Sequence, residues 1–136
     1  MQAPSAANQQ PWEFYCVTDK QKLIELSHSS PYAGVTAFAP VAIVSAYRKD
    51  CLAPVYAEID LSIATQNMWL ETDAQGLGGV WIGIAPIKER IEAVEKALEF
   101  PDTLSAFALF PFGYPNPAEE RMQEDRYDES KIHYVK

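Results

Sequence analysis

The sequence predicts a layered α/β or α+β protein of 136 residues. Two continuous apolar stretches, 38–47 and 104–112, are typical of strands covered on both faces. Segments with helical spacing alternate with the strand-like segments, which gives the order strand, helix, strand, long helix, strand, helix, strand and an extended tail. No internal repeat is present. The length fits a single domain over residues 1–136.

The first strand is expected at 12–19, WEFYCVTD, which combines aromatic and β-branched residues. Thr18 or Asp19 is suited to cap the helix that follows through 19–27. Three apolar side chains of this helix are expected to turn inward: Leu23, Ile24 and Leu26. A loop at 30–34 leads to the apolar strand 38–47.

The longest helical candidate is 55–76, and Gly76 is a natural C-terminal stop for it. Ala57, Leu61, Ala64 and Met68 follow helical spacing along one face. Other apolar side chains make the segment apolar nearly all round: Ile59, Ile63, Trp69 and Leu70. This pattern is typical of a helix buried in a core or in a subunit interface.

The second half begins with a short strand expected at 78–84, GGVWIGI. Pro86 suits the first position of an amphipathic helix that continues through 87–100. The buried strand 104–112 is followed by a turn and a polar tail. In that tail only 131–135, KIHYV, has the composition of a short edge strand.

Composition excludes several classes of function. A net charge of −8 with four scattered arginines argues against a nucleic-acid partner, so an anionic ligand needs a local site. Cys16 and Cys51 are too far apart for a CxxC motif, and His28 and His133 lack neighbours at metal-ligand spacing, so no metal is expected. Without a signal peptide or a long apolar run, the chain is expected to be cytoplasmic and not in a membrane.

Few local motifs carry chemistry by themselves. GLGGVWIG at 76–83 does not match the dinucleotide pattern G-x-G-x-x-G. The glycines have two interpretations: a helix stop followed by tight packing, or open backbone against which a planar ligand can lie. The sequence of this segment alone favours the first. Arg126 stands among acids such as Glu124, where a surface ion pair is favoured over a phosphate contact. No nucleophile–base set is indicated locally.

Three longer segments together resemble the nitroreductase family of FMN-dependent oxidoreductases, over essentially the whole chain. Residues 3–14, APSAANQQPWEF, resemble the family signature A-P-S-x-x-N-x-Q-P-W-x-F. Residues 59–83 resemble its long central helix and the L-G-x-x-W-I-G strand, and 107–127 its last core strand and C-terminal arginine. The resemblance implies a three-layer α+β fold, with a mixed, mainly antiparallel sheet flanked by helices, and an interlocked homodimer.

The resemblance also implies where FMN binds. The opening loop supplies flavin contacts, often in the site of the partner subunit, and here they correspond to Pro4, Ser5, Ala6, Asn8 and Gln10. The backbone beside the flavin ring, where an N–H can address N5, corresponds to Trp81, Ile82, Gly83 and Ile84. The arginine that meets the FMN phosphate corresponds to Arg126.

The implied function is electron transfer from NAD(P)H through bound FMN to nitroaromatic or quinone-like acceptors. The chemistry takes place at the flavin N5, so no catalytic side chain is expected. One departure from the family favours an alternative: relative to the family, an N-terminal helix and an arginine-containing segment are missing before Met1. A second departure is Glu124, which stands where some relatives have lysine and leaves Arg126 as the phosphate candidate of the tail. The alternative is a flavin-deficient, non-catalytic dimeric remnant or flavin-binding module; other flavin chemistry, such as dehalogenation, is a weaker third.

Overall fold

A single antiparallel sheet forms the centre of the protein. The computed structural model describes residues 2–118 and 124–135. The strands within these residues are β1 (Trp12–Val17), β2 (Val41–Arg48), β3 (Gly78–Gly79), β4 (Ile82–Gly83) and β5 (Leu104–Gly113). Their order is β1-β2-β5-β3, and β4 also pairs with β5. Each of these pairings is antiparallel.

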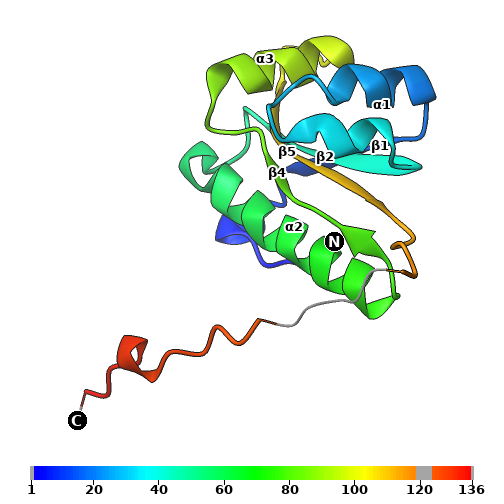
Figure 1. The fold of residues 1–136 in the computed structure, drawn as a ribbon. Coiled ribbons are helices and arrows are strands. Elements are labelled where there is room, and N and C mark those ends of the chain that lie inside the picture. Colours follow the sequence, from blue (N-terminus) through cyan, green and yellow to red (C-terminus); the bar gives the residue numbers. More distant parts are fainter. Residues whose placement is uncertain (1, 119–123, 136) are drawn as a thin grey trace.

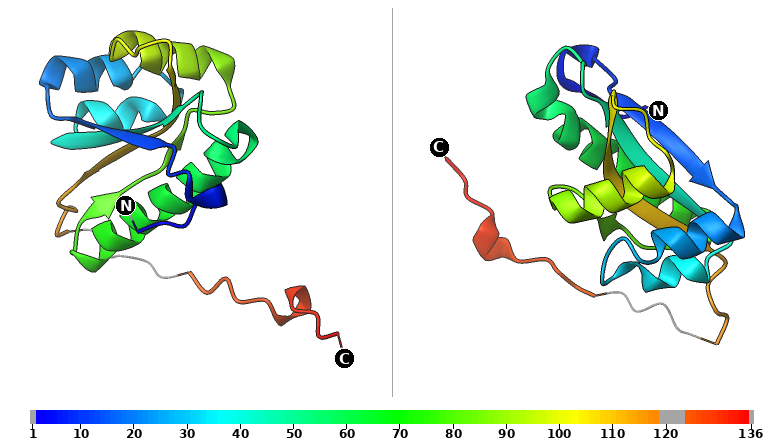
Figure 2. Two further views of the ribbon diagram at one scale, coloured as in Figure 1. Left: turned by 180° about the vertical axis from the view of Figure 1, so that it is seen from behind. Right: turned by 90° about the horizontal axis from the view of Figure 1, so that it is seen from above.

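Helices cover both faces of the sheet and give the expected three layers (Figures 1 and 2). On one face lie α1 (Lys20–Leu26), α3 (Lys88–Ala97) and a 3₁₀ segment, η2 (Ala33–Ala37). On the other lies α2 (Ala57–Ala74). A separate apolar cluster fills each interface, with Leu23, Val44 and Val94 on the α1/α3 side and Trp12, Leu61 and Phe107 on the α2 side.

Most of the predicted elements are confirmed, including two of their end signals. Asp19 caps α1, since its carboxylate accepts a hydrogen bond of 2.9 Å from the Lys22 backbone N–H. Gly76 ends α2 in the left-handed conformation, at φ 76°, and the N–H of Leu77 reaches back to the Thr72 carbonyl.

The predicted strand 78–84 proves to be two short strands. Val80 and Trp81 lie between them, opposite Pro111 and its neighbour in β5. The N–H of Val80 donates to the Pro111 carbonyl, but proline has no N–H to return. The ladder is therefore interrupted at this point.

Two other boundaries and one predicted strand also differ clearly from the structure. The strand expected from residue 38 begins at Val41, after η2. Pro86 does not start the helix: it lies in the turn where the Ile87 N–H donates to the Ile84 carbonyl, and α3 begins at Lys88. The segment 131–135 forms no strand within its described residues.

The long helix α2 buries one face and exposes the other. Leu61, Ala64 and Thr65 lie within the protein, whereas Ile59 and Leu70 are 55% and 61% exposed. The prediction of an all-round apolar helix is thus matched by a buried face on the sheet and an apolar face in contact with solvent. A monomer gives no cover to that second face.

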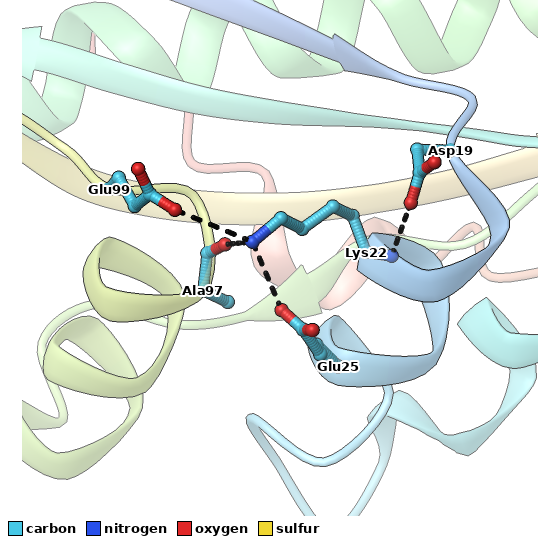
Figure 3. Close-up of polar contacts among 5 residues, drawn as sticks. All are labelled: Asp19, Lys22, Glu25, Ala97 and Glu99. Carbon is cyan, nitrogen blue, oxygen red and sulfur yellow. Dashed lines mark hydrogen bonds and ion pairs between the residues drawn. The ribbon is translucent and has the colours of Figure 1, made fainter.

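Lys22 connects α1 to the end of α3 (Figure 3). Its ammonium donates to the Ala97 carbonyl at 2.7 Å, within the last turn of α3, and lies 3.2 Å from the Glu25 carboxylate. A cation at a helix C-terminus satisfies an otherwise free carbonyl and opposes the helix dipole. This contact fixes the α1/α3 layer from which Arg90 reaches the sheet.

Residues 124–135 extend away from the three layers (Figures 1 and 2). Their one regular element is a 3₁₀ turn, η4 (Glu129–Lys131), and their side chains are exposed. Among the described residues, none of the helices has the length and apolar character required to cross a membrane.

Candidate functional site

The opening loop has an unusual backbone. It contains a 3₁₀ turn, η1 (Ala6–Asn8), preceded by the extended Ser5. Ala7, Asn8 and Gln10 have φ values of 49°, 52° and 46°. Left-handed conformations are uncommon for residues other than glycine, and several in one loop persist only where surrounding contacts enforce them. The loop is therefore held in place by specific partners.

Those partners begin with Asp60, in the first turn of α2. Its carboxylate is 3% exposed and accepts from two parts of the loop. One oxygen accepts from the Ala6 backbone N–H at 2.9 Å, and the other accepts from the Gln9 side-chain amide at 2.7 Å. The same Gln9 amide also pairs with the backbone of Ala53: its oxygen accepts from the N–H at 2.7 Å, and its nitrogen donates to the carbonyl at 3.1 Å.

Two further hydrogen bonds close the loop on itself and on the sheet. The hydroxyl of Ser5 accepts from the Gln10 backbone N–H at 3.0 Å. The guanidinium of Arg48, at the end of β2, donates to the Gln10 carbonyl at 2.9 Å. Asp60, Gln9 and Arg48 were not predicted as site residues.

The side chains predicted to bind flavin lie on the outer side of this loop. Pro4, Asn8 and Gln10 are exposed, and Ser5 and Ala6 are partly buried. The Gln10 amide donates to the Asn8 side-chain oxygen in a long contact of 3.4 Å. Two amides presented to solvent in this way offer both donors and acceptors to a ligand.

The strand end at 81–84 alternates between the two faces of the sheet. Ile82 and Ile84 are buried in the cluster on the α1/α3 side, whereas Trp81 packs on the cluster under α2. Because side chains alternate along a strand, Gly83 faces the α2 side. A Cβ atom placed on Gly83 would have no neighbour within 4 Å, so its backbone is open on that side.

Arg90 of α3 reaches the same strand end. Its guanidinium donates to the Gly83 carbonyl at 2.9 Å and lies 5.8 Å from the centre of the Tyr32 ring. This contact holds the Gly83 peptide from the α1/α3 side and leaves the α2 side free. Sequence reasoning missed it, because nothing in the helix pattern distinguishes Arg90 from a solvated surface residue.

The structure brings both predicted segments to one side of the sheet. Ala3 and Trp12, which flank the opening loop, belong to the same apolar cluster as Trp81 and Ala85, which flank Gly83. On that side a groove of about 590 Å³ runs between α2 and the sheet, and Ala3, Phe14, Met68 and Phe112 are among its lining residues. Its size lies within the usual range for small-molecule sites, but none of the predicted flavin contacts is among its lining residues.

Arg126 is not placed with these segments. It lies in the extended tail, where its guanidinium forms an ion pair of 2.8 Å with Glu124, and the Arg126 side chain is 83% exposed. The surface ion pair favoured from the sequence is thus observed, and a role for Arg126 toward a phosphate remains a prediction. Over residues 2–118 and 124–135, no three His, Cys, Asp or Glu side chains gather as a metal site.

Comparison with known proteins connects this geometry to a family. Residues 25–114 match the model of the nitroreductase family. The chain is 34% identical to a Methanothermobacter thermautotrophicus protein named "Putative NADH dehydrogenase/NAD(P)H nitroreductase". The alignment covers 100% of this chain and 71% of that protein.

Solved structures agree with this match. A structure of a protein of that same name from Bacteroides thetaiotaomicron is 36% identical, with a TM-score of 0.91 over 98% of this chain and 77% of the other. An FMN-dependent nitroreductase from Clostridium difficile is 28% identical, with a TM-score of 0.87 over 98% of this chain and 80% of the other. The layered fold, the opening loop and the glycine-bearing strand end therefore belong to a member of the nitroreductase family.

Proposed function

We propose that this chain binds FMN and passes electrons from NAD(P)H to nitroaromatic or quinone-like acceptors. The observation that carries the proposal is the shared location of the opening loop and the open backbone at Gly83, on the α2 side of the sheet. The names of the relatives, which include an FMN-dependent nitroreductase, support the cofactor and the reaction class.

The residues of the site fit a flavin. An isoalloxazine ring is planar and needs a flat surface without side chains, and a Cβ placed on Gly83 would meet no atom within 4 Å beyond its chain neighbours. The pyrimidine edge of the ring presents both donors and acceptors, which match the exposed amides of Asn8 and Gln10. When bound, FMN supplies the hydride chemistry at its N5 atom.

Each part of the site has a separate task in this proposal. The amides of Asn8 and Gln10, with Ser5, bind and orient the ring, while Pro4 and Ala6 shape the contact surface. The backbone of 81–84 would hold the flat ring, and a backbone N–H there would supply a hydrogen-bond donor to its reactive nitrogen. Arg126 binds the phosphate, which requires its guanidinium to leave the ion pair with Glu124. No side-chain acid or base is assigned.

We further propose a cytoplasmic homodimer with the flavin at the interface. The apolar side chains on the solvent face of α2 support a second copy as its cover; Ile59 and Leu70 are each more than half exposed. Both cysteines are free, which fits a reducing compartment. The strands within residues 2–118 form one sheet, which supports a single domain over 1–136.

The visible absorption spectrum of the purified chain tests the function. We expect bound flavin after incubation with FMN and removal of excess, loss of its colour on anaerobic addition of NADH or NADPH, and return of the colour with p-nitrobenzoate or a benzoquinone. Flavin that binds but stays oxidised with both donors would contradict the oxidoreductase.

The ion pair between Arg126 and Glu124 favours one alternative, a flavin-deficient dimeric remnant. In the described tail the arginine is already paired, and the neighbouring carboxylate repels phosphate. A colourless protein whose spectrum and melting temperature do not respond to FMN would support this alternative against the enzyme.

A further inference from the structure

We propose that Asp60 is a positioning residue of the flavin site, which fixes the opening loop through Gln9. In this role Asp60 touches no cofactor or substrate. It holds the loop in the one conformation that turns the amides of Asn8 and Gln10 outward. The inference rests on the proposed function, since it concerns how that site is built.

The hydrogen bonds of Asp60 bracket the part of the loop that matters. One oxygen accepts from the Ala6 N–H and the other from the Gln9 side chain, at 2.9 Å and 2.7 Å. Ala7 and Asn8, both left-handed, lie between these two attachment points. The carboxylate thus fixes the separation of the two ends of a three-residue turn.

Gln9 passes this constraint to the segment before α2. Its side-chain amide makes two hydrogen bonds with the backbone of Ala53, at 2.7 Å and 3.1 Å. The amide that binds Asp60 is therefore also attached to a second segment of the backbone. The loop is therefore held between Ala53 and Asp60. The side chains of neighbouring Asn8 and Gln10 contact each other at 3.4 Å, and among the described residues they have no anchor comparable to that of Gln9.

The burial of Asp60 indicates that the contact is specific. A carboxylate that is 97% buried is costly unless its oxygens accept hydrogen bonds. Within residues 2–118 and 124–135, the donors to Asp60 are two neutral N–H groups of the loop, and the N-terminal end of α2 adds a favourable dipole. Any other loop conformation that withdraws Ala6 and Gln9 leaves the charge without these donors, so the buried acid selects this conformation.

The test compares three variants of the full chain. Asp60→Asn keeps the size of the side chain but replaces one carboxylate oxygen with an NH₂ group. That group then faces one of the two N–H donors of the loop, at Ala6 or Gln9. Gln9→Met removes the amide and keeps the length. The matched control is Thr65→Val on the same helix, which removes a buried hydrogen bond of 3.2 Å to Ser45 that does not touch the loop.

The readouts are the dissociation constant for FMN, by quenching of flavin fluorescence at a temperature where every variant is folded, and hydrogen exchange of the Ala6 amide. We expect Asp60→Asn and Gln9→Met each to weaken FMN binding about tenfold or more, because a buried partner is left unsatisfied. Ala6 exchange accelerates in Asp60→Asn. Thr65→Val lowers the melting temperature but changes the FMN dissociation constant less than twofold.

The double variant adds a check on the mechanism. Because Asp60 and Gln9 belong to one hydrogen-bond network and share a bond of 2.7 Å, their effects should not add: Asp60→Asn with Gln9→Met should bind FMN no more than about threefold more weakly than either single variant. Wild-type FMN affinity in Asp60→Asn, or an equal loss of affinity in Thr65→Val, would overturn the positioning role. If the wild-type chain binds no FMN, the proposed function itself fails, and faster Ala6 exchange in Asp60→Asn would then assign Asp60 to folding alone.

Discussion

The tight contact at Gly79 gives the sharpest test of how the glycines are used. A Cβ placed on Gly79 would lie 2.6 Å from Phe110 Cζ, 3.0 Å from Phe110 Cε1 and 3.1 Å from Phe112 Cβ. An ordinary contact begins at 3.4 Å, so for Gly79→Ala the Phe110 ring must move by about 0.8 Å.

The Phe110 ring has little room for such a movement. It is fully buried, and the rings of Trp69 and Phe112 lie 6.1 Å and 5.9 Å from its centre. Overpacking of a filled core costs about 1–3 kcal/mol. For a chain of this length a loss of about 2 kcal/mol lowers the melting temperature by about 6–10 °C.

Thermal unfolding followed by circular dichroism measures this effect. The matched control is Gly78→Ala in the same short strand, where the added Cβ would lie 3.6 Å from Pro115 Cβ, an ordinary contact. We expect the control to melt within about 4 °C of the wild type, because a single tolerated methyl group changes the stability by less than about 1 kcal/mol. If Gly79→Ala also melts within that range, Phe110 moves freely and the tight-packing interpretation is wrong.

Four further predictions concern the proposed site. Gly83→Ala should leave the melting temperature unchanged, because its methyl group enters open space, but weaken FMN binding about tenfold in fluorescence titration by separating ring and backbone. Asn8→Ala should weaken FMN binding or slow hydride transfer in stopped-flow measurements with little loss of folded dimer; unfolding without an effect on flavin would make the loop structural. Arg126→Ala should weaken FMN binding through loss of a phosphate partner, and unchanged affinity would contradict its assignment. If the proposed dimer forms, Leu70→Asp should convert it to a monomer in light scattering, because the substitution would bring a charge into the apolar interface; a persisting dimer would place the interface elsewhere.

The fold was predictable because its signals are local and strong. The strand β5 is buried on both faces along most of its length, and such a strand appears in the sequence as an unbroken apolar run. The cap at Asp19 and the stop at Gly76 depend on single residues with few alternatives. The break between β3 and β4 depends on their pairing opposite Pro111 of β5, so the residue pattern of 78–84 did not predict it.

The candidate site was predictable only in part, for the same reason. Asn8, Gln10 and Gly83 were predicted through resemblance to a family signature, and the structure adds that residues flanking both segments pack on the α2 side. Arg126 shows the opposite case. Its neighbouring acids predicted the ion pair with Glu124 that is observed, whereas a contact with a ligand depends on where the tail lies and not on its local sequence.

Asp60 shows which signal could have been read. It lies three residues after Ala57 and four before Ala64, so helical spacing alone places it on the buried face of α2. An acid on a core face is rarely left without partners. The partners must then come from outside the helix, and the amide-rich loop that precedes β1 is rich in suitable donors. A buried acid within an apolar helix is thus better evidence for a loop held in one conformation than the exposed amides themselves, since exposed amides occur on any protein surface.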